Sequence, residues 1–368
     1  MNIKTALSIK DTVDEMVDDL ALQLACIDAK MVLFFASTNY DPQTISKKMQ
    51  DSFPWANVLG CTTAGEIGDG KMLEGSTVAM AFTGQAINNA KIEVVVDPHD
   101  KTAIRAAFAS FESHYNMPMS MMDPSEYVGI VLVDGLSRIE EGLMDTIGDL
   151  TNVTFIGGSA GDDFKFSTTH LYANGKSYKK GAILALLKPG VNFTCIKTQS
   201  FKNLGKTLEV TRTGKEVREV LEFNGKPAAV AYANAVGVSI EEAPKHFIRY
   251  PVGLVIEGEP YVRAIQQFKG DAMVFFCGVL EGMELSLLES TDIIGDTRKV
   301  ISSAREAMGG LSAIINFNCS LRTAELKQKN LTKEYGELFA DYPTIGFSTY
   351  GEQYIGNLNQ TATMIVFK

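Results

Sequence analysis

Apolar residues recur at helical spacing near the start of the chain. Val13, Met16, Val17, Leu20 and Leu24 follow one another at intervals that fit one face of a helix, and acidic residues lie between them. A period of about 3.6 residues places such side chains on a single stripe. Residues 1–28 therefore predict an amphipathic N-terminal helix rather than the charged and then apolar stretch of a signal peptide.

Three uninterrupted apolar runs predict buried strands, and a helix is expected after each run. The runs occupy residues 32–36, 128–133 and 313–317. Asp41 before Pro42 predicts the start of the first helix, because a capping residue before a first-turn proline is typical of helix N-termini. Ser137 followed by Glu140 predicts a capping box for the second helix. The third helix is expected within residues 322–339.

A motif of glycines and hydroxyl residues follows each predicted strand and helix. It reads LGCTTAGE at residues 59–66, IGGSAGD at 156–162 and IGFSTYGE at 345–352. Another apolar strand is predicted after each motif, at residues 78–82, 182–187 and 363–367. The chain is thus interpreted as an internal repeat of strand, helix, strand, glycine–hydroxyl turn and strand.

The three turns are the first candidate for a binding site. Glycines at strand ends permit close backbone approach, and hydroxyls supply hydrogen-bond donors and acceptors. If the repeated units pack face to face, the turns line one polar pocket; the alternative is that they are ordinary tight turns. The predicted ligand-contacting residues of these turns are Thr62, Thr63, Ser159, Asp162, Thr349, Tyr350 and Glu352.

The middle of the chain has a different pattern. From residue 225 to residue 289, short runs alternate between apolar and polar side chains, which predicts a meander of strands. The Asn224-Gly225 pair is a turn signal and marks the expected boundary, giving domains at 29–224 and 225–368 after the N-terminal helix. The predicted fold class is α+β, with two α/β halves whose mixed, largely antiparallel sheets are covered by helices and internally repeated.

Length and charge narrow the class of protein. A chain of 368 residues exceeds what one hydrophobic core usually serves, roughly 250–300 residues, so two domains are expected. The net charge is −10 and no basic stripe is present, which disfavours a nucleic-acid partner. The protein is expected to be a non-membrane protein, because no run of about 18 apolar residues occurs.

The cysteines indicate the compartment. There are five of them, and no two are spaced as C-x-x-C. An odd, scattered set predicts reduced thiols in a cytoplasmic protein and no four-cysteine zinc site.

A hydrolase is the main enzymatic alternative. Residues 157–161 read GGSAG, which fits the G-x-S-x-G pattern of a serine nucleophile. That pattern requires a strand, a sharp turn and a helix, and a nearby histidine base. Here a strand rather than a helix is predicted after Ser159. The protein is therefore expected not to be an enzyme, and no catalytic residue is assigned.

Four further residues are candidates for ligand contact. His246 lies among aromatic residues and is the candidate axial ligand for a haem iron. Arg263 interrupts an apolar run, where it is either an outward-facing residue or a fork that binds a carboxylate. Asn318 and Arg322 belong to a burst of polar residues that ends an apolar strand, and both are predicted to contact the ligand.

Several of these segments together resemble the FIST family, which has an N-terminal and a C-terminal FIST domain. The carriers are VLFFAS at 32–37, GCTTAGE at 60–66, FIGGSAGDD at 155–163, YVR at 261–263, FNCSLR at 317–322 and GFSTYGE at 346–352. The resemblance implies a FIST N domain at 29–224 and a FIST C domain at 225–368. It also implies a sensory module of bacterial signal transduction that binds a small molecule, with amino acids as the proposed ligands.

Two segments are similar to a haem-binding, nitric-oxide-sensing (NosP-type) branch of the family. They are FFCG at 275–278 and GNLNQT at 356–361. That branch implies haem as a cofactor and a separate histidine kinase or cyclic-di-GMP enzyme as the partner. A histidine is expected just before the Asn-Gln-Thr stretch, whereas this chain has Asn357 or Leu358 there. Two hypotheses therefore stand: a haem-based sensor that uses His246, and a sensor of a small polar metabolite that uses Arg263.

Overall fold

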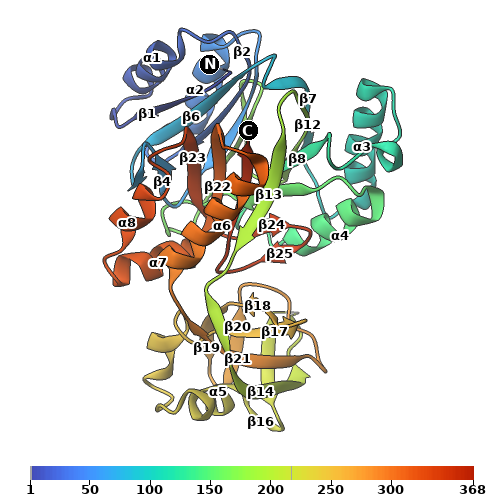
Figure 1. Cartoon of the computed structure of the whole chain (residues 1–368). Helices are drawn as coiled ribbons and strands as arrows, with labels where there is room; N and C mark the ends of the chain where they lie inside the picture. Colours follow the sequence, from blue (N-terminus) through green and yellow to red (C-terminus); the bar gives the residue numbers. More distant parts are fainter. Residues whose placement is uncertain (1, 217) are drawn as a thin grey trace.

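The protein, described by a computed structural model for residues 2–216 and 218–368, folds into a body and a smaller cap. The cap is formed by residues 200–290 and lies below the body in Figure 1. The body is built from three units with the same order of elements. Each unit consists of a strand, a helix, a strand, a helical segment, a strand, a two-stranded hairpin and a final strand.

The first unit begins at the N-terminus. Its elements are β1 (Ile3–Ser8), α1 (Val13–Leu24), β2 (Ala29–Ala36), α2 (Pro42–Ser52), β3 (Asn57–Thr62), β4 (Glu66–Gly68), β5 (Lys71–Leu73) and β6 (Thr77–Thr83). The predicted amphipathic helix is confirmed as α1, which Thr12 caps. The predicted cap of the next helix is also confirmed, because Asp41 accepts a hydrogen bond from Thr44 N at 2.8 Å.

The second unit repeats this order. Its elements are β7 (Ile87–Val95), α3 (Lys101–Tyr115), the short 3₁₀ helix η1 (Met119–Met121), β8 (Val128–Val133), α4 (Glu140–Leu150), β9 (Phe155–Ser159), β10 (Leu171–Ala173), β11 (Lys176–Tyr178) and β12 (Ala182–Pro189). The predicted capping box is wrong. Ser137 Oγ donates to the Asp134 carboxylate at 2.7 Å, and the helix begins later, after Ile139, without a side-chain cap.

The third unit contains the cap as an insertion. Its elements are β13 (Phe193–Thr198), α6 (Ile293–Met308), β22 (Ala313–Cys319), α7 (Ser320–Gln328), α8 (Thr332–Glu337), β23 (Thr344–Thr349), β24 (Glu352–Tyr354), β25 (Asn357–Leu358) and β26 (Ala362–Phe367). The helix expected within 322–339 is thus two helices. The cap lies between β13 and α6, where the other two units have short loops.

The three units exchange their hairpins in a ring. In each sheet the four long strands of a unit are joined in the same order, with one parallel pair: β2 with β3, β8 with β9, and β22 with β23. The hairpin β4–β5 then joins the third unit's sheet, β10–β11 joins the first, and β24–β25 joins the second. Each six-stranded sheet is therefore completed by a neighbouring unit.

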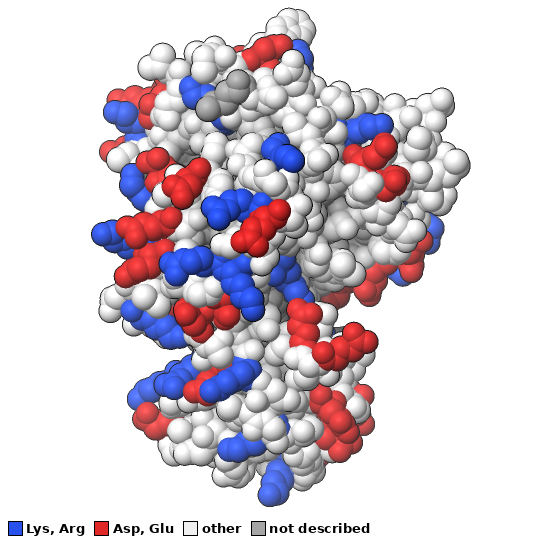
Figure 2. All heavy atoms as spheres, in the orientation of Figure 1, with Lys and Arg blue, Asp and Glu red and all other residues white. Residues whose placement is uncertain are grey.

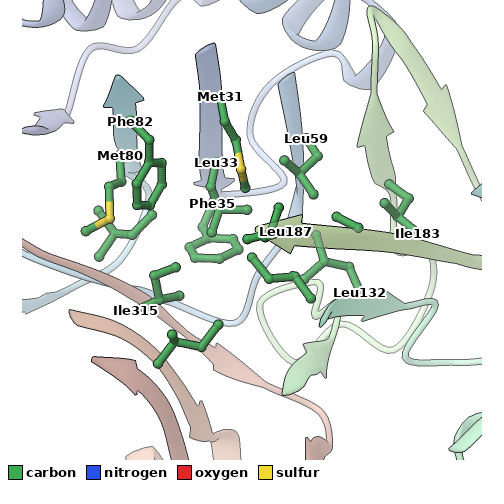
Figure 3. Packing of buried hydrophobic residues seen from close by; sticks show 14 of the residues in the cluster. Met31, Leu33, Phe35, Leu59, Met80, Phe82, Leu132, Ile183, Leu187 and Ile315 are labelled. Carbon is green, nitrogen blue, oxygen red and sulfur yellow. The ribbon is translucent and has the colours of Figure 1, made fainter. Parts of the chain in front are cut away.

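The inner faces of the three sheets share one hydrophobic core. Leu33 and Phe35 of the first sheet, Leu132 and Ile183 of the second, and Ile315 of the third are all fully buried in it. Figure 3 shows these side chains pointing toward one another from the three sheets. The strands are buried on both faces, which explains why they appear in the sequence as unbroken apolar runs.

Helices cover the outer face of each sheet. α1 and α2 pack on the first sheet, α3 and α4 on the second, and α6, α7 and α8 on the third. The predicted α+β class with mixed, mostly antiparallel sheets under helices is confirmed. The internal repeat is more extensive than the sequence indicated, because each unit also contains an initial strand, an initial helix and the exchanged hairpin.

The cap has its own sheet and core. Its elements are β14 (Phe201–Thr213), β15 (Glu219–Phe223), β16 (Lys226–Pro227), α5 (Ala228–Val236), the 3₁₀ helix η2 (Ala243–His246), β17 (Val252–Ile256), β18 (Glu259–Arg263), β19 (Ile265–Lys269), β20 (Ala272–Phe275) and β21 (Glu284–Ser290). The strand-rich middle is thus confirmed. Its two chain ends meet, since Thr291 N donates to Ser200 O at 2.8 Å.

The expected domain boundary falls inside the cap. Asn224 and Gly225 do form a turn with positive φ, but this turn joins β15 to β16 within the cap sheet. The structural division lies at residues 200 and 290, where the chain enters and leaves the cap. The N-terminal segment likewise contains more than a helix, because β1 pairs with β6 in the first sheet.

Candidate functional site

The three glycine–hydroxyl turns meet at the centre of the body. Each turn is hydrogen-bonded through its backbone to both of the others: Ala64 N to Ser348 O at 3.0 Å, Gly161 N to Thr62 O at 3.0 Å, and Ser159 N to Gly351 O at 2.8 Å. Segments nearly 300 residues apart in the chain are therefore in direct contact. The structure thus brings together the residues that the repeat predicted as neighbours.

Four predicted ligand residues are used inside this junction. Thr62, Thr63, Ser159 and Thr349 are each at most 1% exposed. Thr349 Oγ1 donates to Ser159 O at 2.8 Å, and Thr62 Oγ1 accepts from His170 N at 2.9 Å. Ser159 Oγ instead donates to Glu140 Oε1 and accepts from Gln353 Nε2, both at 3.2 Å. None of the four residues lines a cavity described below. Their contact with a ligand stays a prediction.

A carboxylate follows each turn and anchors the chain beyond it. Glu352 accepts hydrogen bonds from Thr361 N at 3.1 Å and from Thr361 Oγ1 at 2.8 Å, at the start of β26. Glu66 binds Ser76 before β6 in the same way, at 3.0 Å and 2.6 Å. Burial raises the pKa of Glu66 to about 7 and that of Glu352 to about 8. Both residues therefore hold the exchanged hairpins to their own units.

Asp162, the acidic residue that follows the second turn, lies in the loop before β10 and has the opposite character. Burial opposes its ionisation, but hydrogen bonds from Tyr350 and from the amides of Ser167, Thr168 and Phe166 lower its pKa. Tyr350 Oη donates to Asp162 Oδ1 at 2.6 Å. The ionised carboxylate thus orders the loop between β9 and β10 and fixes the ring of Tyr350.

Asn318 and Arg322 form a buried polar cluster beside the cap junction. Arg322 is 1% exposed, and its Nε donates to Asn318 Oδ1 at 3.2 Å. Its two terminal nitrogens donate to the hydroxyls of Ser200 and Thr297. Arg322 therefore links α7 to α6 and to the entry of the cap, and it lies away from the cavities described below.

A cavity of about 590 Å³ lies between the cap and the body, and we call it the cap cleft. In the space-filling view of Figure 2 the molecule narrows where the cap meets the body. The cap contributes Leu254, Ile256, Tyr261, Arg263, Cys277, Gly278, Leu280 and Met283. The body contributes Glu141, Asp145, Lys197 and the residues 354–358 of the β24–β25 hairpin.

The guanidinium of Arg263 lines the cap cleft and has few hydrogen-bond partners. It is half-buried, and its Nε has no exposed surface and no hydrogen-bond partner among the residues the structure describes. Its Nη1 makes one long contact, 3.5 Å to Val262 O. Asn357 Oδ1, from the body side of the cleft, is buried and unpartnered in the same sense. The guanidinium of Arg263 therefore has hydrogen-bonding capacity that the described residues do not use.

An ion pair between the cap and the body borders the cleft at Glu141. Arg218 of the cap binds Glu141 at 2.8 Å and Glu140 at 3.3 Å. Glu141 also accepts from Gly278 N at 3.0 Å and from Asn357 Nδ2 at 3.3 Å. Although burial opposes ionisation of Glu141, the Arg218 charge and these hydrogen bonds lower its pKa. Glu141 is therefore an ionised contact between cap and body.

A second cavity, of about 260 Å³, lies on the other side of this ion pair. It is lined by Glu140, Arg218 and Tyr350 together with aromatic residues of both parts. The Tyr350 ring stacks on Phe166 with centroids 4.9 Å apart. Arg263 and Tyr350 are thus the two predicted site residues that face cavities at the boundary between cap and body.

Neither Cys277 nor Ser159 is set up as a nucleophile. Burial raises the pKa of Cys277 to about 11, so its thiol is not a ready nucleophile. Ser159 is fully buried, and the residues that follow its turn form β10 rather than a helix. The strand, turn and helix of a hydrolase nucleophile are therefore not formed.

His246 lies apart from both cavities at this boundary. It ends η2, is half-buried, and has its ring centroid 5.8 Å from that of Tyr250. No histidine lines the cap cleft. Within residues 2–216 and 218–368, no group of three or more His, Cys, Asp or Glu residues is arranged to hold a metal ion.

The sequence indicated part of this site and missed the rest. The sequence indicates Arg263 because it interrupts an apolar run. The segments 275–278 and 356–361, which the sequence analysis also singled out, both contribute to the cavities. Glu141, Lys197 and Arg218 were missed. Each is an ordinary charged residue in a different element, and no spacing along the chain connects them.

Two family models match the chain. The model described as FIST N domain matches residues 30–226, and the model described as FIST C domain matches residues 228–355. The limit between the two matches falls inside the cap. The chain is also 23% identical over 314 residues to an uncharacterized protein of Methanocaldococcus jannaschii, covering 80% of this chain and 60% of that protein. The chain thus spans less than two thirds of this relative's length.

Among the helices described, not one combines the length and the apolar character needed to cross a membrane.

Proposed function

The chain belongs to the FIST family, whose domains are sensory modules of signalling proteins, and from this premise we propose that it senses a small carboxylate-bearing metabolite in the cap cleft. One observation carries the proposal. The guanidinium of Arg263 lines a cavity with a buried, unpartnered Nε and without a carboxylate at ion-pair distance among the described residues. A cation in that state has hydrogen-bonding capacity in excess of what the protein uses.

A ligand carboxylate fits this group for geometric and electrostatic reasons. The planar guanidinium offers parallel N–H donors that match the two oxygens of a carboxylate. The terminal nitrogens make one long contact within the protein, from Nη1 to Val262 O at 3.5 Å, and charge-assisted hydrogen bonds from them to a carboxylate are stronger than neutral ones. On the body side of the cleft, Asn357 is held in place because its Nδ2 binds Glu141 at 3.3 Å.

The position of the cleft supplies a route for the signal. Its lining comes from both the cap and the body, so a bound ligand contacts both parts at once. A ligand that binds one cap orientation more tightly than another shifts the equilibrium toward that orientation. The shift equals the difference between its two binding free energies. We propose that a separate signalling protein, a histidine kinase or a cyclic-di-GMP enzyme, reads this orientation.

Thermal unfolding with a panel of amino acids and small carboxylates tests the proposal. A ligand at about 100 times its Kd stabilises the folded state by about 2.7 kcal/mol, which raises Tm measurably. We expect stabilisation in the wild type and its loss in Arg263→Ala. Arg212→Ala serves as the control, because Arg212 lies on the same cap and pairs with Glu222 at the surface. Equal stabilisation of wild type and Arg263→Ala would contradict the proposal.

Haem-based nitric-oxide sensing, the other function raised by the resemblance, does not fit the residues present. The position where that branch has a histidine is Asn357 or Leu358 here, and both line a cleft without histidine. His246 lines neither cavity at the cap–body boundary. No step is derived through haem. An absorption spectrum of protein expressed with haem is expected to lack a Soret band, and a band that changes in His246→Ala would overturn this conclusion.

A further inference from the structure

The rim of the cap cleft is apolar. Three aliphatic side chains stand at the rim with most of their surface in solvent: Ile256 and Leu280 are each 54% exposed, and Ile355 is 79% exposed. They come from three separate segments, of which two belong to the cap and one to the body. Scattered exposed aliphatic residues are ordinary, but three that converge on one cavity mouth are typical of an apolar binding surface.

The apolar surface continues inward from the rim. Leu254 and Met283 of the cap and Leu358 of the body line the same cavity. Arg263 lines it as well, and its Nε is inaccessible to solvent. The cleft therefore offers a cation at a buried position and aliphatic side chains from there to an open mouth.

Ile355 holds an unusual backbone conformation at the rim. Its φ is +60°, in the left-handed region that β-branched residues rarely adopt. A glycine or an asparagine at the tip of this hairpin would form the turn at lower cost. Strain of this kind is retained mainly where the side chain has a function, and here the side chain extends the rim of the cleft.

We propose that the ligand is an aliphatic carboxylate, bound with its head at Arg263 and with its hydrocarbon chain leading out between Ile256, Leu280 and Ile355. This inference rests on the proposed function and specifies its ligand class. A fully polar ligand would leave the aliphatic rim in water, whereas a neutral hydrocarbon would cover the cleft and leave the charge of Arg263 unpaired. An amphiphile with an anionic head satisfies both ends of the cleft.

The test is the chain-length dependence of binding. Isothermal titration calorimetry measures Kd for straight-chain carboxylates from butanoate to dodecanoate, each below its micelle concentration. Burial of a methylene contributes about 0.8 kcal/mol when complete, so we expect affinity to rise about two- to fourfold per methylene until the chain passes the rim. Arg263→Ala is expected to weaken binding at every length.

Variants of the rim separate a binding role from a structural one. Leu280→Ser and Ile355→Asn are expected to lower the gain in affinity per methylene. Ile355→Asn is also expected to raise Tm without ligand, since asparagine tolerates positive φ. Ile240→Ser is the control, because Ile240 is an exposed aliphatic residue of the cap that does not line the cleft.

Each outcome decides between the two proposals. Equal affinity at all lengths, with binding that still requires Arg263, overturns the aliphatic ligand and leaves a polar carboxylate sensor in place. Chain-length dependence that persists unchanged in Arg263→Ala also overturns the inference, because the head is then not bound as stated. If neither the amino acids nor any carboxylate of the series binds, the proposed function fails together with its extension.

Discussion

Burial sets the acid–base character of single residues in the body. Glu352 and Asp162 each follow one of the glycine–hydroxyl turns, yet the pKa of Glu352 is raised to about 8 and that of Asp162 is lowered. Desolvation dominates at Glu352, whose Oε1 has no partner among the described residues. At Asp162 one phenolic and several backbone donors outweigh desolvation. The same carboxyl chemistry therefore gives a neutral anchor in one unit and an ionised one in another.

The raised pKa of Glu352 predicts a pH-dependent stability. Because its folded-state pKa lies above the ordinary value of 4.5, its protonated form favours folding, and this contribution falls as pH rises from about 4.5 through about 8. The difference in unfolding free energy between the wild type and Glu352→Gln should therefore fall as pH rises, by up to ~1.4 kcal/mol per pH unit in this window. Urea unfolding at several pH values measures the difference. The exposed Glu306→Gln variant is the control and should follow the wild type.

The parallel strand pair is the element that recurs most strictly. Its second strand carries a glycine in every unit, at Gly60 in β3, Gly157 in β9 and Gly346 in β23. A Cβ at these positions would lie 2.0, 1.7 and 2.3 Å from a carbonyl oxygen of the preceding strand. The glycine is therefore required by the close approach of the two backbones.

This close approach predicts unequal effects of two glycine substitutions. Gly157→Ala forces β8 and β9 apart and should destabilise the protein by about 3 kcal/mol or more. Gly142→Ala, on the exposed side of α4 with open space around it, should instead stabilise by up to ~1 kcal/mol through helix propensity. Denaturant unfolding compares the two. A mild effect of Gly157→Ala would show that the strands separate easily.

At the scale of the whole molecule, the exchanged hairpins and the inserted cap have different roles. Every sheet of the body includes strands from a neighbouring unit, so no unit completes its own sheet. The cap instead has its own sheet and core and joins the body at residues 200 and 291, which are hydrogen-bonded. The body is therefore an indivisible structure, and the cap is an addition to it.

This architecture predicts that the cap is dispensable for folding. Replacing residues 201–290 with a short glycine-containing turn should leave a body that unfolds cooperatively, because Ser200 and Thr291 are already adjacent and the three-sheet core includes no cap residue. The same deletion should abolish stabilisation by carboxylates, since it removes Arg263. Circular dichroism and thermal unfolding report both results. A molten or insoluble body would show that the cap supports the fold.

The sequence alone determined the local structure of the body. The apolar runs at 32–36, 128–133 and 313–317 predicted strands because strands buried on both faces lack polar interruptions. The three turns were predicted as neighbours from their shared motif. The predicted capping role of Ser137 is wrong, because its hydroxyl pairs with Asp134 instead of capping α4. A capping pattern in the sequence does not reveal such a competing acceptor.

Only the tertiary structure decided which sheet each hairpin joins and where the cleft lies. Strand edges pair through backbone amides and carbonyls that every residue carries, so side-chain patterns do not specify whether β4 pairs within its own unit or with β23. The cleft likewise depends on long-range placement. Arg263 signals only an interruption of a strand. It becomes a candidate ligand group because folding places it in the cleft between cap and body and leaves its Nε without a partner among the described residues.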